Sequence, residues 1–386
     1  MKKHALEENI FQDTVDPSEH ERQREAVEVT PSLGSERMIE KLGVLDNAIN
    51  HDEVLTSEDM MALDNVLENK DIKVLVGGQE FTIGELEKVA EENKEIWDEI
   101  CSGNFRNFEK LTFVTPEIAT YLVEKKTDLC FRNLTILSAP VAEILSKIED
   151  KKNLSFKVTK ISDEVAEHLS KHVGTLFLSE VTELSDKAAE LLSHHDGTIS
   201  LGPTHLSSSA AESLSNHKGY SLSLNGLTEI SDEIAEFLSK YKGRSLDLNG
   251  LTEFSDKAAE YFANFKGTHL ELNGLTHISD SVAEHLSKTK AYLDFRGVKS
   301  ISDSVAAHFA NFKGDQLGFH SLSHLSDLAA EYLSKSDTHL HLDEVSGLSE
   351  KAAEHLSRCK SGIDFQRAPE AKRMVEKYKQ QHGKTN

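Results

Sequence analysis

A segment in the middle of the chain is followed directly by a near-copy of itself. Residues 222–245 read LSLNGLTEISDEIAEFLSKYKGRS, and residues 246–269 read LDLNGLTEFSDKAAEYFANFKGTH. Similar copies occur eleven times, each marked by one apolar anchor residue: Val114, Leu137, Ile161, Leu184, Leu206, Ile230, Phe254, Ile278, Ile301, Leu325 and Leu348. A regular period of two dozen residues is typical of a solenoid, in which each repeat packs on the next.

The second half of each repeat predicts a short helix. Ser or Thr follows every anchor, and its hydroxyl can accept a hydrogen bond from the first free N–H groups of a helix. The fifth residue after the anchor is Ala in all copies, and apolar residues at the fourth and eighth positions complete one buried face. The constant Ala indicates a helix packed closely on its neighbour. A glycine near the helix end, such as Gly219 or Gly243, is expected to form a left-handed cap.

The first half of each repeat predicts a strand. The triplets LSL, LDL, LEL and LDF alternate in polarity, which is typical of a strand with one buried face. One strand and one helix cannot bury their apolar faces alone, whereas stacked copies share a continuous core. We therefore expect a curved parallel sheet on the inner side of the array and helices on the outer side.

The repeat pattern LxLxxLxxL resembles the leucine-rich repeat LxxLxLxxNxL over residues 104–366. The resemblance implies an α/β fold, a right-handed leucine-rich-repeat solenoid of about 11 repeats with a small N-terminal capping region. Repeats of 23–24 residues with an aliphatic residue in the usual Asn position are similar to the treponemal-type bacterial subclass, although the Pro and Cys of that subclass are missing here. The aliphatic residues are Leu227, Leu251, Leu275, Val298 and Leu322.

The flanking segments are expected to cover the ends of the solenoid. Residues 35–103 predict an N-terminal cap with helices over 35–49 and 57–68 and a hairpin in IKVLVGGQEFTI. The polar, acidic residues 1–34 predict a disordered tail. Residues 367–386 predict a basic capping helix and tail.

Charge and composition exclude several classes of partner. The formal net charge is −23, and residues 1–100 hold 26 acidic against 10 basic residues. Such a chain repels phosphate groups, so neither nucleic acid nor a membrane is an expected partner. No apolar stretch is long enough to span a bilayer, the N-terminus lacks the apolar segment of a secretory signal, and three scattered cysteines do not suggest disulfides. These features predict a cytoplasmic protein.

The sequence favours a non-enzymatic scaffold that binds another protein through its concave sheet face. It contains no phosphate loop, dinucleotide fingerprint, nucleophile elbow or zinc-protease motif, and no cofactor is predicted. The alternative for this face is a solvated polar row with no single partner. The strand residues expected on it are Ser221, Ser223, Ser245, Asp247, His269, Glu271, Tyr292, Asp294, Arg296, His320, His339, His341 and Asp343.

Two further hypotheses remain open. His320, His341 and Asp343 share the concave face, and two imidazoles with a carboxylate could bind Zn²⁺ as a metal site or metal-dependent enzyme centre. Adjacent coils are expected to bring Gln316 and Asp364 to the same place. Alternatively, residues 1–100 carry the activity and the repeats only dock them. Asn residues in the LNGLT turns are expected to bond to backbone groups.

Overall fold

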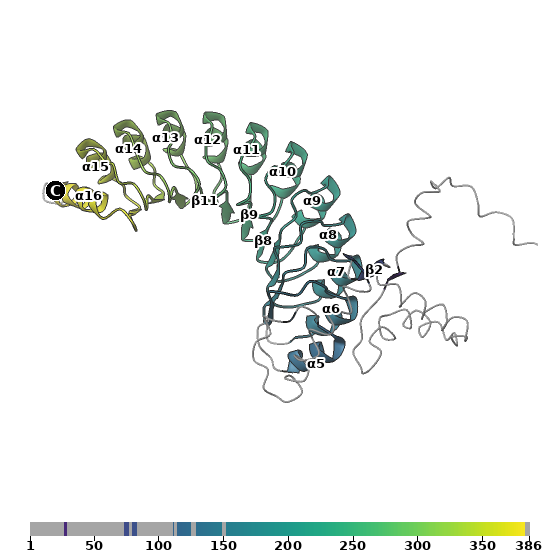
Figure 1. Ribbon diagram of the computed structural model, residues 1–386. Helices are drawn as coiled ribbons and strands as arrows, with labels where there is room; N and C mark the ends of the chain where they lie inside the picture. Colours follow the sequence, from purple (N-terminus) through teal and green to yellow (C-terminus); the bar gives the residue numbers. More distant parts are fainter. Residues whose placement is uncertain are drawn as a thin grey trace, which may run out of the picture.

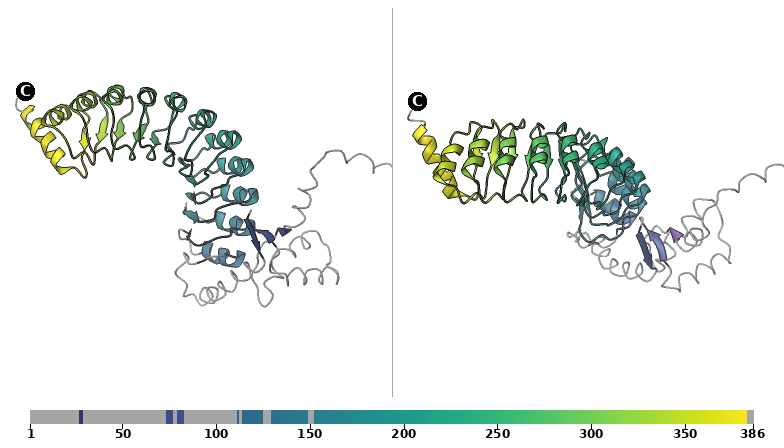
Figure 2. Two further views of the ribbon diagram at one scale, coloured as in Figure 1. Left: turned by 45° about the horizontal axis from the view of Figure 1, so that its top comes forward. Right: turned by 90° about the horizontal axis from the view of Figure 1, so that it is seen from above.

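Strands and helices alternate along one curved array, with the helices on its outer side and the strands on its inner side (Figure 1, Figure 2). The chain is a leucine-rich-repeat-like α/β solenoid, as predicted. This computed structural model describes residues 27–28, 73–76, 79–82, 111, 114–124, 129–148 and 152–382.

Eleven parallel strands form the inner sheet, and each strand pairs with those that precede and follow it in the sequence. The strands are β4 (Leu129–Phe131), β5 (Leu154–Phe156), β6 (Leu176–Leu178), β7 (Ile199–Leu201), β8 (Ser221–Ser223), β9 (Ser245–Asp247), β10 (His269–Glu271), β11 (Tyr292–Asp294), β12 (Gln316–Gly318), β13 (His339–His341) and β14 (Ile363–Asp364). One core position runs through all of them and is always Leu or Ile. Leu246 pairs with Leu270, for example, and both are fully buried.

A helix follows each strand on the outer side, and one more helix precedes β4. The helices are α5 (Pro116–Glu124), α6 (Ala139–Ser146), α7 (Asp163–Ser170), α8 (Asp186–Ser193), α9 (Ser208–Ser215), α10 (Asp232–Leu238), α11 (Asp256–Phe262), α12 (Asp280–Leu286), α13 (Asp303–Phe309), α14 (Asp327–Ser334), α15 (Glu350–Leu356) and α16 (Pro369–His382). The alanine five residues after each anchor is fully buried in all eleven copies, which confirms the predicted inward face.

The serine after the anchor caps the helix as predicted. Nine of these serines accept a hydrogen bond from the N–H three residues later, as Ser255 does from Ala258 at 2.9 Å. The capping serine also donates to the aspartate at the start of the preceding helix in seven places; Ser279 Oγ lies 3.2 Å from Asp256 Oδ1. The acidic residue therefore stabilises its own helix and links it to the next coil.

The helix-end glycines are not left-handed caps, contrary to the prediction. Among the described residues only Gly362 has a positive φ, of 99°. At Gly219 a Cβ atom would lie 1.9 Å from the carbonyl oxygen of Gly197 and 2.5 Å from a ring atom of His217. These positions therefore require glycine because the preceding coil and a buried ring leave no room for a side chain.

That ring belongs to a buried ring column, which consists of His172, His195, His217 and Tyr241. Successive ring centroids lie 6.1, 6.3 and 6.1 Å apart, and the planes are within 13° of parallel. Each ring bonds to a carbonyl of the preceding coil: His195 Nε2 lies 3.0 Å from Gly174 O, and Tyr241 Oη donates to Gly219 O at 3.0 Å. The column fills the space between the helix ends and the sheet.

The turn asparagines bond to backbone, as predicted, but across coils. Asn225 Oδ1 accepts from the N–H of Asn249 at 2.9 Å, Asn249 Oδ1 from Asn273 at 3.1 Å, and Asn273 Oδ1 from Arg296 at 3.0 Å. This chain of bonds fixes the spacing of the turns beside the concave face.

Some of the structure predicted for the two ends of the chain lies among the described residues. The predicted hairpin is present as β2 (Lys73–Val76) and β3 (Gln79–Thr82), which pair antiparallel, and β1 (Val27–Glu28) pairs parallel with β2. The other structure predicted for residues 1–34 and 35–103 lies outside the described residues. Helix α16 buries Ala371 and Val375 against the last coil. None of the helices in the described part is long and apolar enough to cross a bilayer; the cytoplasmic location stays a prediction.

Candidate functional site

Each strand places one residue on the concave face, the middle residue in β4–β7 and the last residue in β8–β14, and the register aligns these residues in a single row. We call this row the concave column: Cys130, Ser155, Phe177, Ser200, Ser223, Asp247, Glu271, Asp294, Gly318, His341 and Asp364. Its chemistry changes along the array, from small and apolar residues through three carboxylates to a histidine and aspartate cluster.

The predicted concave residues lie on this face, but they differ in accessibility. Ser221, Ser245, His269, Tyr292 and His339 form a second row beside the concave column. Ser221, Ser223, Asp294 and Asp343 are buried, Arg296 is exposed, and the other predicted residues are half-buried.

Three carboxylates occupy adjacent strands in the middle of the concave column. Asp247 accepts a hydrogen bond from Ser245 Oγ at 2.5 Å, and Glu271 accepts from Asn249 Nδ2 at 2.9 Å. Burial raises the pKa of Asp247 to about 6; Ser245 opposes the rise and the charge of Glu271 adds to it. Asp247 and Glu271 are therefore acidic side chains on neighbouring strands, and the ion pairs found in the described part of the chain include neither of them.

The third carboxylate, Asp294, lies beside a guanidinium and an imidazole. Arg296 Nε lies 2.9 Å from its Oδ2, and His320 Nε2 lies 3.3 Å from its Oδ1. Burial nevertheless raises the pKa of Asp294, against the opposing effects of His320 and Arg296. Gly318 makes this packing possible, because a Cβ atom there would lie 2.8 Å from Tyr292 Oη and 2.9 Å from His320 Nε2.

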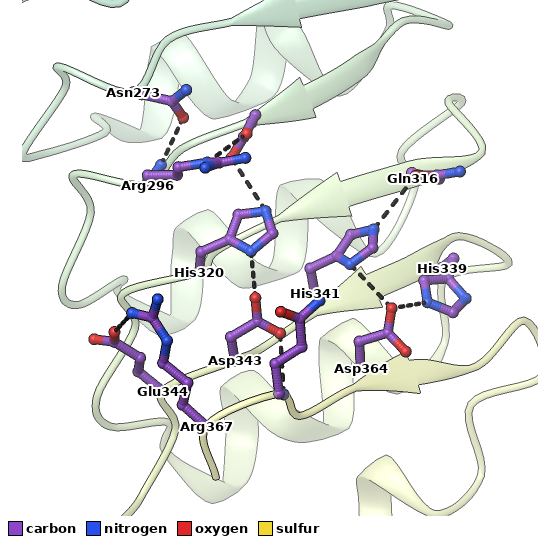
Figure 3. A network of polar contacts seen from close by, with 12 residues as sticks. Asn273, Arg296, Gln316, His320, His339, His341, Asp343, Glu344, Asp364 and Arg367 are labelled. Carbon is purple, nitrogen blue, oxygen red and sulfur yellow. Dashed lines mark hydrogen bonds and ion pairs between the residues drawn. The ribbon is translucent and has the colours of Figure 1, made fainter.

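His320 joins three coils. Its Nδ1 lies 2.5 Å from Asp343 Oδ2 (Figure 3). Tyr292 Oη lies 3.2 Å from its Nε2. Asp343 Oδ1 accepts a hydrogen bond from the backbone N–H of Gln366 at 3.2 Å. It thus links two coils in the same way as the turn asparagines do. Both oxygens of Asp343 are therefore engaged within the protein.

The residues that come closest to a metal-ligand arrangement are not the predicted set. Among the described residues, one group of His, Cys, Asp or Glu ligand atoms lies within 4.8 Å of one another: His339, His341 and Asp364. The predicted set of His320, His341 and Asp343 is divided, because Asp343 pairs with His320 and the ring of His341 stacks on that of His320 at 5.3 Å. The candidate ligands thus lie one coil nearer the C-terminus.

This cluster converges on one oxygen atom. Asp364 Oδ2 lies 3.1 Å from His339 Nε2 and 3.2 Å from His341 Nδ1 (Figure 3). The opposite ring nitrogens face carbonyl oxygens: His339 Nδ1 lies 2.9 Å from Ser361 O, and His341 Nε2 lies 3.3 Å from Gln316 Oε1. Burial lowers the pKa of His341, the charges of His320 and His339 lower it further, and Asp364 and Asp343 oppose this.

Sequence reasoning overlooked three residues of this face. Gly318 stands at a column position where the repeats just before it have a polar side chain. This departure from the pattern could have indicated close packing at that point. Phe177 on β6 is 40% exposed, although polar side chains are usual at solvent-facing positions. Asp364 was expected nearby but not as a ligand, because its contact depends on the register between β13 and β14.

Comparison with known proteins supplies likenesses in structure alone. No protein-family model matches the sequence, and no curated protein matches it either. An internalin from Listeria monocytogenes is 16% identical, with a TM-score of 0.38 over 65% of this chain and 69% of that one. A chain of the Drosophila Toll–Spatzle complex is 12% identical, with a TM-score of 0.38 over 60% of this chain and 38% of that one. Its glycosylated form gives 10% identity and a TM-score of 0.39 over 65% and 41%. This chain therefore spans well under half of the Toll-complex chains.

Proposed function

We infer that this protein is a non-enzymatic scaffold whose concave face binds another protein, and that the half-buried carboxylates Asp247 and Glu271, beside the buried Asp294, contact a basic segment of that partner. The observation that carries this proposal is the contrast between the concave column and the rest of the repeat. The column holds seven residue types in eleven positions, whereas the core position beside it holds only Leu and Ile.

One position on the outer helices of the repeat does not vary in this way. On the outer helices, the sixth residue after the anchor is Glu in nine of eleven copies. Six of these glutamates form ion pairs with Lys or Arg four residues later, as Glu236 does with Lys240 at 2.8 Å. This outer position is nearly constant, whereas the concave column differs from coil to coil, which supports the proposal that each coil contacts a different part of a ligand.

The acidic part of the column defines the chemistry of the expected partner. Neighbouring strands are roughly 4.8 Å apart, so Asp247 and Glu271 repel each other, and Asp247 has a raised pKa in part for that reason. A lysine or arginine side chain placed between them removes this repulsion. Charge complementarity of this kind determines specificity and association rate more than affinity.

We also propose that the repeats belong to the treponemal-type subclass, because an aliphatic residue stands in the usual Asn position of each repeat named above.

Affinity capture from the native extract tests the proposal with charge-matched variants. One variant carries Asp247→Asn, Glu271→Gln and Asp294→Asn; the control carries Glu167→Gln, Glu236→Gln and Glu284→Gln on the outer helices. Both remove three negative charges, and circular dichroism shows whether each stays folded. We expect the control to retain the partners of the wild type and the concave variant to lose them. Equal capture by both variants would contradict the proposed binding face.

A further inference from the structure

We propose that His339 Nε2, His341 Nδ1 and Asp364 Oδ2 form a binding site for a divalent transition-metal ion, with zinc as the preferred ion. The inference is independent of the concave partner, since it concerns the far end of the face. It also differs from the metal set expected from the sequence, because it uses Asp364 and His339 in place of Asp343 and His320.

The spacing of the three atoms is close to that of zinc ligands. Zinc binds imidazole nitrogen and carboxylate oxygen at about 2.0–2.2 Å, so two ligands in a tetrahedron are about 3.4 Å apart. The distances from Asp364 Oδ2 are 3.1 Å to His339 and 3.2 Å to His341, and the two ring nitrogens lie within 4.8 Å of each other. Two edges of the tetrahedron are thus already formed, and a small rotation of the half-buried rings closes the third.

The outer hydrogen bonds orient both imidazoles for coordination. In the tautomer with the proton on Nδ1, His339 donates to Ser361 O and its Nε2 lone pair faces Asp364. Nε2 also lies within hydrogen-bond distance of Asp364 Oδ2, at 3.1 Å, and a bound ion takes the place of the proton in that contact. His341 Nε2 likewise donates to Gln316 Oε1, which leaves the Nδ1 lone pair facing the same oxygen. Metal-binding histidines almost always donate their other ring N–H to such an acceptor.

Without a cation this arrangement is unfavourable. In these tautomers two lone pairs point at one carboxylate oxygen, and His341 Nδ1 is a buried atom that has no hydrogen-bond partner. Protonating the rings instead would place positive charges on His339 and His341, whose centroids are 5.0 Å apart, beside the ring of His320. A single divalent ion satisfies all three ligand atoms at once.

The donor set selects the ion. Imidazole nitrogen suits zinc and other first-row transition metals, whereas Mg²⁺ and Ca²⁺ require oxygen ligands. Three protein ligands leave one position of the tetrahedron open toward the concave face, because Asp364 and His339 are partly exposed.

Titration with Co²⁺, followed by visible absorption and by displacement with Zn²⁺, tests the site. We expect one Co²⁺ per chain in the wild type, at least tenfold weaker binding in Asp364→Asn and His341→Asn, and weakening of about 10–100-fold in Gln316→Ala. Mg²⁺ should not compete. His269→Asn is the matched control, because His269 lies on the same face and bonds to Thr268 rather than to the cluster.

The proposal is overturned if Asp364→Asn and His341→Asn bind Co²⁺ as tightly as the wild type, or if the wild type takes up less than about a tenth of an equivalent. A loss of equal size in His269→Asn would also overturn it, since the metal would then be held by scattered histidines. The folded state of each variant is checked by its thermal unfolding without metal. Failure here leaves partner capture by Asp247, Glu271 and Asp294 unaffected, so the two proposals are separable.

Discussion

The buried ring column makes the stability of the solenoid sensitive to acid, and His195 allows the effect to be calculated. Its side chain is fully buried, its Nε2 donates to Gly174 O at 3.0 Å, and its Nδ1 has no hydrogen-bond partner. A second proton on the ring would therefore be buried without an acceptor. His172 and His217 lie on either side of this ring and have the same deficit.

Burial lowers the pKa of His195 from 6.5 to about 4; the charges of His217 and His172 add to this, and backbone bonds from Gly174 and Ser170 oppose it. In the unfolded chain the ring titrates near 6.5, so below that pH only the unfolded state takes up the proton. The free energy of unfolding therefore falls as the pH falls from about 7 towards 4. His195 alone lowers it by about 2 kcal/mol between pH 8 and pH 5, and by about 3 kcal/mol at most.

The two flanking histidines act in the same direction. Burial lowers the pKa of both His172 and His217; backbone hydrogen bonds oppose the shift at both, and the charge of Asp196 opposes it at His217. The total acid sensitivity of the column is therefore larger than that of His195 by itself.

His195→Tyr tests this calculation, because Tyr241 already fills the equivalent position two coils away and donates to the carbonyl of Gly219. Urea unfolding followed by circular dichroism gives the free energy of unfolding at pH 8 and pH 5. We expect the difference between the two pH values to shrink by about 2 kcal/mol in the variant, whatever its absolute stability. His194→Tyr is the control, since His194 is adjacent in sequence and exposed.

The reasoning is refuted if His195→Tyr loses as much stability between pH 8 and pH 5 as the wild type does. It is equally refuted if the exposed His194→Tyr removes the pH dependence. Carboxylates elsewhere titrate in all three proteins and cancel in the comparison.

Two local predictions concern the repeat itself. Ser255→Ala removes the hydrogen bond to the N–H of Ala258 at 2.9 Å and should lower the free energy of unfolding by about 1 kcal/mol, measured by urea unfolding. Gly219→Ala places a Cβ atom 1.9 Å from a backbone oxygen of the preceding coil and should cost about 1–3 kcal/mol, seen as a lower melting temperature, whereas a left-handed cap would not involve that coil.

The repeating features of this fold could be predicted from the sequence because each has a local physical cause. Ser255 follows its anchor and caps its helix, and Ala259 is fully buried where the helices pack closely. Leu246 and Leu248 alternate with Asp247 and indicate which strand face is buried. Eleven copies of one pattern make such inferences reliable, since a chance match would not recur.

Features that depend on contacts between coils were less accessible. The buried ring column has His in three coils and Tyr241 in the fourth, but the equivalent position is Phe265 in the next coil and Cys359 in the last repeat, so no single residue type marks it along the array. Gly219 was expected to adopt a left-handed conformation, whereas its role is to give space to a ring from its own coil and a carbonyl from the one before.

The metal site illustrates the same limit. Strand alternation placed His339 and His341 on the concave face, but which carboxylate reaches them depends on the register of the following strand. That register pairs His341 with Asp364, while the oxygens of Asp343 are occupied by His320 and by the N–H of Gln366. A spacing rule within one coil could not distinguish the two aspartates.

The position of the metal ligands also determines where a bound ion would stabilise the protein. In a solenoid each coil is stabilised by its neighbours, and the last strand of the sheet pairs with one other strand only. Strand β14 (Ile363–Asp364) is the last strand of the sheet, and it pairs with β13, where Leu342 N–H donates to Asp364 O at 2.9 Å. An ion held by His339 and His341 on β13 and by Asp364 on β14 joins these strands through their side chains. Zn²⁺ should therefore slow hydrogen exchange at the Leu342 amide and leave the amides of β6–β8 unchanged, an effect that Asp364→Asn abolishes. Equal slowing along the whole sheet would mean that the ion binds elsewhere.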